Sequence, residues 1–231
     1  MRELDGTIRL VVFDCDGTLV DGQHAIITAM SDAFRSADLT EPQPEQIRRV
    51  VGLPLLEAVA RLAPASDPGV HAALGKAYTD AFQRRRQSPD HYEPLFPGVL
   101  EILDSLLGSG YELGIATGKS RRGLALTLER HGIFKHFTIL KTSDDGPGKP
   151  SPHMLISAMV DTGANPASTV MVGDTVFDIE MARSAAVAAI GVNWGYHEGA
   201  ELRAAGATAV VDNFGELPAL IEGLIGRTGR A

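Results

Sequence analysis

Residues 11–21 read VVFDCDGTLVD, and the fold and the site can both be followed outward from this stretch. Its apolar, β-branched residues predict a buried strand, and that strand ends on two acidic residues, Asp14 and Asp16. Two carboxylates so close together raise each other's pKa and cost stability unless a positive charge lies between them. The stretch therefore predicts either a solvated strand end or a site that holds a cation.

Apolar runs of strand length recur along the chain, and amphipathic stretches with leucines at helical spacing separate them. Strands that alternate with helices predict a parallel sheet covered on both faces, an α/β fold with a Rossmann-like core. The spacing leaves the order of the strands in the sheet open. The predicted strands are IRLVVF (8–13), YELGIAT (111–117), HFTILK (136–141), TVMVG (169–173), VAAIGV (187–192) and TAVV (208–211).

The interval from about residue 21 to residue 92 breaks this alternation, because it contains only helical patterns. The patterns lie at 25–37, 44–51, 53–63 and 70–86, and prolines at 89, 94 and 97 then suit a linker. We predict an α/β core of residues 1–20 and 93–231, interrupted by an all-helical cap domain of residues 21–92. Arg84, Arg85 and Arg86 are expected to form a solvated helix end.

The composition excludes several classes of function. The chain has 231 residues and a formal net charge of −8, and this acidic balance argues against a nucleic-acid surface. The sequence contains no run of about 18 apolar residues, so it predicts no membrane span. The charged first residues do not resemble a signal peptide. A single cysteine, Cys15, allows no intrachain disulfide. We therefore expect a cytoplasmic protein, either a monomer or a homodimer, that binds neither nucleic acid nor membrane.

Polar residues follow the predicted strands at the points where the strands end. In open parallel sheets ligands bind beyond the carboxyl ends of the strands, so these residues are expected to meet at one edge. After Asp14 and Asp16, they are Thr117 and Lys119 in IATGK, Lys149 in KTSDDGPGKPSP, and Asp174 and Asp178 in GDTVFD.

This set of residues suits phosphoryl transfer. A phosphate monoester repels an anionic nucleophile, so a cation must lie between the two, and carboxylate oxygens suit Mg²⁺. Asp14 is the expected nucleophile, which would form an aspartyl phosphate, and Asp16 is the expected general acid and base. Thr117 and Lys149 would donate to the equatorial phosphate oxygens.

Four motifs in this order, FDCDGTLVD, IATGK, GKPSP and GDTVFD, resemble the haloacid dehalogenase-like hydrolases, specifically the phosphatases with a helical cap. The C-terminal stretch GVNWGYHEGAELRAAGATAVVD is similar to the phosphoglycolate phosphatase branch. The resemblance implies a Mg²⁺-dependent phosphatase that hydrolyses small phosphorylated metabolites, with Gly118 among the residues that bind phosphate. It also implies that Asp14, Asp174 and the backbone carbonyl of Asp16 bind the metal, while Asp178 acts indirectly.

The cap stretch VGLPLLEAV contains Gly52, Leu53 and Pro54, and the resemblance places substrate-selecting residues at this point. An ordinary helix start, with Pro54 near its first position, explains the same stretch equally well.

Each site residue has a similar structural alternative: Lys149 could be a surface lysine, and Asp178 an acidic residue in the first turn of a helix. Because Lys149 follows glycine and proline, we expect its replacement to spare folding.

Three other functions fit part of this pattern. A dehalogenase of the same fold would need neither a metal nor Asp16. A β-phosphoglucomutase-like phosphotransferase would keep all four motifs, so the core motifs do not separate it from a hydrolase. A non-catalytic phosphate-binding module should have lost at least one catalytic position, and every expected one is present.

Overall fold

The structure is a computed structural model that describes residues 7–88 and 93–225. Its six strands form one parallel sheet in the order β3-β2-β1-β4-β5-β6, which confirms the predicted α/β class. The strands are β1 (Leu10–Phe13), β2 (Glu112–Ala116), β3 (Ile139–Lys141), β4 (Thr169–Gly173), β5 (Ala188–Val192) and β6 (Ala209–Val211). The first strand lies between β2 and β4, so Asp14 emerges near the middle of the sheet edge.

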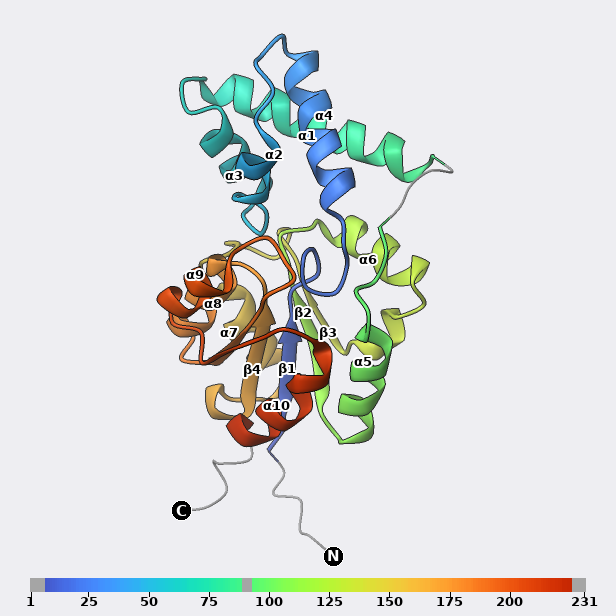
Figure 1. The fold of residues 1–231 in the computed structure, drawn as a ribbon, viewed down its shortest axis with the longest axis vertical. Coiled ribbons are helices and arrows are strands. Elements are labelled where there is room, and N and C mark those ends of the chain that lie inside the picture. The colour runs from blue at the N-terminus through green and yellow to red at the C-terminus, as the bar shows by residue number, and fades with distance from the viewer. Residues whose placement is uncertain (1–6, 89–92, 226–231) are drawn as a thin grey trace, which may run out of the picture.

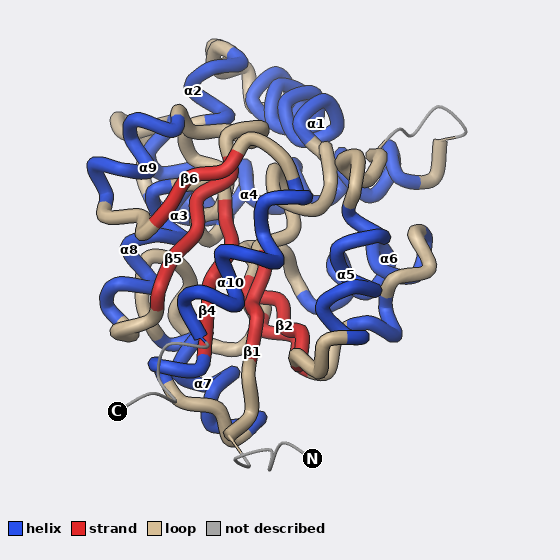
Figure 2. The backbone as a smooth tube through the Cα atoms, turned by 60° about the horizontal axis from the view of Figure 1, so that its bottom comes forward, coloured by secondary structure: helices blue, strands red, loops and turns tan. Residues whose placement is uncertain are grey.

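Helices cover both faces of the sheet (Figures 1 and 2). On β1, Val11 and Phe13 pack with α5, α6 and α10, while Leu10 and Val12 pack on the other face with α7, α8 and α9. This alternation follows from the two-residue period of a strand, and both faces are apolar because both are buried. The helices are α5 (Val99–Gly108), α6 (Arg121–Arg130), α7 (His153–Thr162), α8 (Val176–Ser184), α9 (Gly199–Ala205) and α10 (Leu217–Ile225).

Four helices form a separate layer beyond the carboxyl ends of the strands (Figure 1). They are α1 (Gln23–Ser36), α2 (Pro44–Arg48), α3 (Leu55–Leu62) and α4 (Pro68–Arg86), close to the four helical patterns in the sequence. Ile26, Phe34, Ile47 and Leu74 belong to one buried cluster of their own. Each such side chain contributes about 1.5–3 kcal/mol when it is buried, so these helices have an independent apolar core.

The helical layer contacts the sheet layer through a smaller apolar cluster. Val50 and Leu53 pack with Phe177 at the start of α8. Arg49 forms an ion pair with Glu201 of α9 at 2.6 Å. These contacts hold the loop between α2 and α3 close to the strand ends.

The strand predicted at residues 136–141 is shorter in the structure. The run at 136–141 gives a strand of only three residues, because β3 lies at the sheet edge and pairs with β2 alone; residues 134–136 form a 3₁₀ turn instead. Pro89 of the expected linker lies outside the described residues. Within the described ranges, no helix has both the length and the apolar character needed to cross a membrane.

Candidate active site

The loops after β1, β3 and β4 bring together the charged groups that the sequence placed at strand ends. The Nζ atom of Lys149 lies 2.7 Å from Oδ1 of Asp14 and 2.6 Å from Oδ1 of Asp178. Asp174 completes the group, since one carboxylate oxygen from each of the three aspartates lies within 4.8 Å of the others. All four side chains are buried. The alternative of a solvated strand end is therefore excluded, since Asp14 and Asp16 are both buried.

Backbone and hydroxyl groups fix the orientation of Asp174. Its Oδ1 accepts a hydrogen bond from the Thr18 hydroxyl at 2.8 Å, and its Oδ2 accepts one from the Tyr196 backbone N–H at 2.9 Å. Gly17 makes this approach possible, because a Cβ atom there would collide with Asp174 Oδ2 and with the ring of Tyr196. Its positive φ of 83° also favours glycine.

Asp178 has both carboxylate oxygens engaged. Its Oδ2 accepts hydrogen bonds from the Thr175 backbone N–H at 3.0 Å and the Thr175 hydroxyl at 2.7 Å, in a capping box at the start of α8. Its Oδ1 faces Lys149. The carboxylate thus connects the first turn of α8 to the lysine and holds the ammonium beside Asp14.

Burial dominates the electrostatics of this cluster. It raises the pKa of Asp14 to about 7 despite the opposing charge of Lys149, and the neighbouring Asp178 and Asp16 raise it further. Burial also raises the pKa of Asp174 well above its usual value, and the charges of Asp14 and Asp178 add to this effect. Burial alone would lower the pKa of Lys149, but its two carboxylate neighbours outweigh it and raise the pKa.

The three carboxylates fit a hard divalent cation. One ammonium balances only part of their charge, and their donor atoms are all oxygens, which Mg²⁺ prefers. A cation between them would also reduce the repulsion that raises the pKa values of Asp14 and Asp174. Asp16 contributes no side-chain oxygen to this group, because its carboxylate pairs with Lys119 instead.

Mg²⁺ should stabilise the protein more strongly as the pH rises. Without a cation, Asp14 and Asp174 bind protons more tightly in the folded than in the unfolded chain, so the free energy of unfolding falls between about pH 4 and pH 7. Mg²⁺ binds the ionised carboxylates and offsets this loss. At about 100 times Kd it adds about 2.7 kcal/mol, so we expect Tm to rise by about 5–10 °C at pH 8 and much less at pH 5. Thermal unfolding with Mg²⁺ and with EDTA measures the difference.

Two variants control this measurement. Asp174→Asn should remove most of the Mg²⁺-dependent rise in Tm, whereas Glu101→Gln, an exposed position on α5, should keep it. A rise of equal size at pH 5 and pH 8 would contradict the link to these carboxylates.

Asp16 belongs to a second charged network beside the first. Lys119 Nζ lies 2.9 Å from Asp16 Oδ1 and 3.3 Å from Oε1 of the buried Glu93, and Arg86 lies 3.6 Å from the other Glu93 oxygen. Burial raises the pKa of Asp16, although Lys119 opposes the shift. A raised pKa favours the protonated form that a general acid requires.

The expectation of a solvated helix end is wrong for Arg86. Only 13% of its side chain is exposed, and it donates hydrogen bonds to the Gly123 carbonyl at 3.1 Å and the Thr127 hydroxyl at 2.7 Å. Both partners lie in α6. The last turn of α4 is therefore held against the sheet layer, and this packing buries one of the three arginines.

The loop after β2 meets the loop between α2 and α3. Thr117 is buried, and its hydroxyl accepts a hydrogen bond from the Lys119 backbone N–H at 3.3 Å. A Cβ at Gly118 would lie 3.1 Å from the carbonyl oxygens of both Gly52 and Leu53, so a larger residue would crowd this contact. Pro54 packs on Gly148, directly before Lys149.

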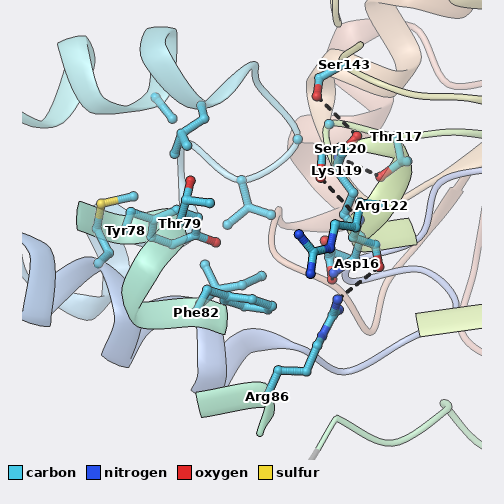
Figure 3. Close-up of a pocket in the computed structure, with 18 of the residues that line it drawn as sticks. Asp16, Tyr78, Thr79, Phe82, Arg86, Thr117, Lys119, Ser120, Arg122 and Ser143 are labelled. Atoms are coloured by element: carbon cyan, nitrogen blue, oxygen red, sulfur yellow. Dashed lines mark hydrogen bonds and ion pairs between the residues drawn. The ribbon is translucent and has the colours of Figure 1, made fainter. Parts of the chain in front are cut away.

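A cavity of about 800 Å³ opens between the helical layer and the strand ends (Figure 3). Most of the predicted site residues line it, namely Asp14, Asp16, Gly52, Leu53, Thr117 and Gly118. Lys149, Asp174, Asp178 and Pro54 lie outside this lining. The three charged residues are fully buried, and Pro54 is the N-cap residue of α3, as the helix-start alternative predicts. The cavity thus gives a ligand access to Asp14 and Asp16. Lys149, Asp174 and Asp178 lie next to Asp14 on its buried side.

Several residues that support the site were not singled out from the sequence. Thr18 and Thr175 stand inside the motifs DGT and GDT, so a hydroxyl beside each acidic residue was a usable signal. No comparable signal in the sequence marked Tyr196 or Glu93. Tyr196 acts through its backbone N–H, and Glu93 reaches Lys119 only because the chain returns to the sheet at that point.

The comparisons with known proteins agree with this geometry. Residues 11–192 match the family model described as haloacid dehalogenase-like hydrolase. A protein named probable phosphatase IndB from Dickeya dadantii (strain 3937) is 39% identical, over 90% of this chain and 91% of that protein. A phosphoglycolate phosphatase from Vibrio parahaemolyticus serotype O3:K6 (strain RIMD 2210633) is 30% identical, over 91% and 94%. A solved structure described as a predicted phosphatase from Clostridium acetobutylicum superposes with a TM-score of 0.83 at 25% identity, covering 95% of this chain and 100% of that one.

Proposed function

The chain belongs to the haloacid dehalogenase-like hydrolase family, and from this membership and the site geometry we propose that it is a Mg²⁺-dependent phosphatase. Its substrates are small phosphomonoesters, and its reaction proceeds through an aspartyl phosphate on Asp14. Relatives named phosphatase and phosphoglycolate phosphatase support this assignment.

One observation carries the proposal: a lysine lies between two buried carboxylates, and only one of the two reaches the cavity. Asp14 lines the cavity, whereas Lys149 and Asp178 do not. Asp14 can therefore meet a phosphorus atom while Lys149 stays beside it. The ammonium compensates the charge that builds up on the phosphoryl oxygens in the transition state.

The residues have the following roles in the proposed reaction. An oxygen of Asp14 attacks phosphorus, and the alcohol leaves as the aspartyl phosphate forms. The Thr117 hydroxyl and the Gly118 backbone contact the phosphoryl oxygens from the loop after β2, where both residues line the cavity. Water then hydrolyses the acyl phosphate and regenerates Asp14.

Asp14, Asp174 and the backbone carbonyl of Asp16 would hold the Mg²⁺ ion. Bound there, Mg²⁺ supplies positive charge between the anionic nucleophile and the phosphate dianion. Thr18 and the Tyr196 N–H keep Asp174 oriented, and Asp178 keeps Lys149 in place.

Asp16 is the proposed general acid and base. It lines the cavity two residues after the nucleophile, and its raised pKa favours a proton on the carboxyl before the first step. It gives that proton to the leaving oxygen and then takes one from the attacking water. Lys119 Nζ lies 2.9 Å from Asp16 Oδ1 and holds this side chain in place.

We propose further that α1–α4 act as the cap predicted for residues 21–92, on a core of residues 1–20 and 93–231. Gly52 and Leu53 bring the cap to the edge of the phosphate-binding loop, which is where a cap would contact the substrate's alcohol portion. The reducing cytoplasm suits the single cysteine, the buried and unpaired Cys15.

A panel of phosphomonoesters, assayed with Mg²⁺ and with excess EDTA, tests the function. We expect phosphate release with Mg²⁺ and none in EDTA, and equal amounts of alcohol and inorganic phosphate. Alcohol without phosphate, in the presence of an acceptor sugar phosphate, would indicate a phosphotransferase instead. Full activity in EDTA would contradict the metal assignment.

Asp16→Asn should separate the two roles of Asp16. The nitrophenolate group of p-nitrophenyl phosphate can leave unprotonated, but the second step still needs a base for water. Rapid mixing at saturating Mg²⁺ should therefore show a burst of nitrophenolate near one equivalent of enzyme, followed by slow turnover. An alkyl phosphate should give neither a burst nor turnover.

Asp14→Asn is the control, and it should give no burst with either ester. Equal losses of aryl and alkyl hydrolysis in Asp16→Asn, without a burst, would mean that Asp16 only supports the metal site.

A further inference from the structure

The cap side of the cavity is apolar and aromatic. Figure 3 shows Tyr78 and Phe82 of α4 facing the strand-end side of the cavity, where Asp16, Thr117 and Lys119 lie. The two rings are 5.8 Å apart between centroids and tilted by 37°. Aliphatic side chains from α1 and from the α2–α3 loop continue this wall, namely Ile26, Met30, Val50 and Leu53.

Lys119 and Arg86, the two cations in the network around Asp16, already have carboxylate partners. Lys119 pairs with both Asp16 and Glu93, and Arg86 lies 3.6 Å from Glu93, so the two cations and the two carboxylates balance one another when both acids are ionised. Arg86 binds Glu93 and the α6 backbone. A second carboxylate attached next to the phosphate, as in phosphoglycolate, would lie close to Asp16 and Glu93, which already hold these two cations. Arg122, which also lines the cavity, lies at the exposed start of α6.

The cavity is also larger than a two-carbon acid phosphate requires. Cavities of roughly 300–1,000 Å³ typically enclose drug-sized ligands, and this one measures about 800 Å³. A small anionic substrate would leave the aromatic wall in contact with water. An apolar substrate group would cover it and gain the transfer free energy of the buried surface.

We propose that the substrates are phosphomonoesters of alcohols that carry a flat, uncharged ring, and that Tyr78 and Phe82 contact that ring. This inference rests on the proposed phosphatase activity. The ring of Phe82 is held in place by two cations, with Lys119 Nζ at 5.4 Å and Arg86 Cζ at 5.3 Å from its centroid. A fixed aromatic face favours a flat ring, which can stack on it in an offset or edge-to-face arrangement, over a flexible chain.

Three alkyl esters test the substrate class: 2-phenylethyl phosphate, hexyl phosphate and phosphoglycolate. All three release an alkoxide, so they need the same acid catalysis, and differences in kcat/KM report on the rest of the molecule. We expect 2-phenylethyl phosphate to exceed phosphoglycolate by about 10- to 100-fold, with hexyl phosphate between them.

Variants of the aromatic wall then connect this ranking to named residues. Phe82→Ala and Tyr78→Ala should lower the ratio of kcat/KM between 2-phenylethyl phosphate and phosphoglycolate by about tenfold. Phe82→Leu keeps an apolar side chain but no ring, and should reduce the advantage over hexyl phosphate. Lys76→Ala, an exposed position on the same helix that does not line the cavity, should leave the ranking unchanged.

The outcomes separate the two proposals. A preference for phosphoglycolate, or equal rates for the phenyl and hexyl esters, overturns the ring-bearing substrate class and leaves the phosphatase assignment intact. An unchanged ranking in both Phe82 variants and in Tyr78→Ala overturns the assigned contacts. No phosphate release from any ester with Mg²⁺ overturns the proposed function, and the substrate class falls with it.

Discussion

Asp14→Asn should abolish phosphatase activity, with a fall in kcat on the order of 10⁴ or more, because the nucleophile of the first step is lost. An amide has nearly the shape of a carboxylate but does not attack phosphorus, so no aspartyl phosphate can form. The fold should survive, since the substitution removes one of three crowded carboxylates whose burial is unfavourable. Steady-state kinetics with Mg²⁺ and a phosphomonoester, together with circular dichroism, measure both effects.

Asp21→Asn is the matched control for this variant. Asp21 lies seven residues further along the same loop region, and within residues 7–88 and 93–225 its carboxylate accepts only a long hydrogen bond of 3.4 Å from the Gln23 backbone N–H. It is not part of the carboxylate cluster. We expect activity close to wild type in this control. If Asp14→Asn kept more than about a tenth of the wild-type rate, Asp14 could not be the nucleophile.

Lys149→Met should reduce both activity and stability. We expect kcat to fall by about 10²–10³, the usual effect of removing one group that stabilises transition-state charge. The free energy of unfolding should fall by about 3–5 kcal/mol, because the substitution leaves two buried carboxylates without their partner. The loop position suggested that folding would be spared, but the structure buries this side chain completely. Urea unfolding and steady-state kinetics measure the two losses.

Lys141→Met provides a close comparison. Lys141 is the last residue of β3, and it pairs with Asp161 at 2.6 Å, but that partner is half exposed and lies outside the cavity lining. This variant should keep its activity and lose no more than about 1 kcal/mol. The double variant Lys149→Met/Asp178→Asn should recover part of the stability but not the activity. Wild-type kinetics in Lys149→Met would remove the lysine from the mechanism.

The sequence predicted the fold class and most of the positions around the site because both follow from local rules. The period of apolar residues distinguishes strands from helices, and parallel strands present their carboxyl ends at one edge. Asp14, Thr117, Lys149 and Asp174 therefore lie near one another, as their places after successive strands required. Cys15 could be placed in the core for a similar reason, since strand alternation turns it away from its acidic neighbours.

Only the tertiary structure decided how these residues are paired. Thr18 and Asp174 are separated by 156 positions, and Tyr196 reaches Asp174 from the loop after β5. The same holds for Lys119, whose partner Glu93 stands where the chain returns from the cap. No periodic pattern records such contacts, because they depend on the order of strands in the sheet and on the packing of loops.

The sequence by itself thus determined the order of strands and helices along the chain and the chemistry available at the strand ends. The tertiary structure alone decided that β1 lies between β2 and β4, that Lys149 is buried between two carboxylates, and that α4 presents Tyr78 and Phe82 to the cavity. The physical reason is the range of the interactions. Backbone periodicity acts over a few residues, whereas desolvation and ion pairing depend on every segment that packs against a group, however distant it is in the chain.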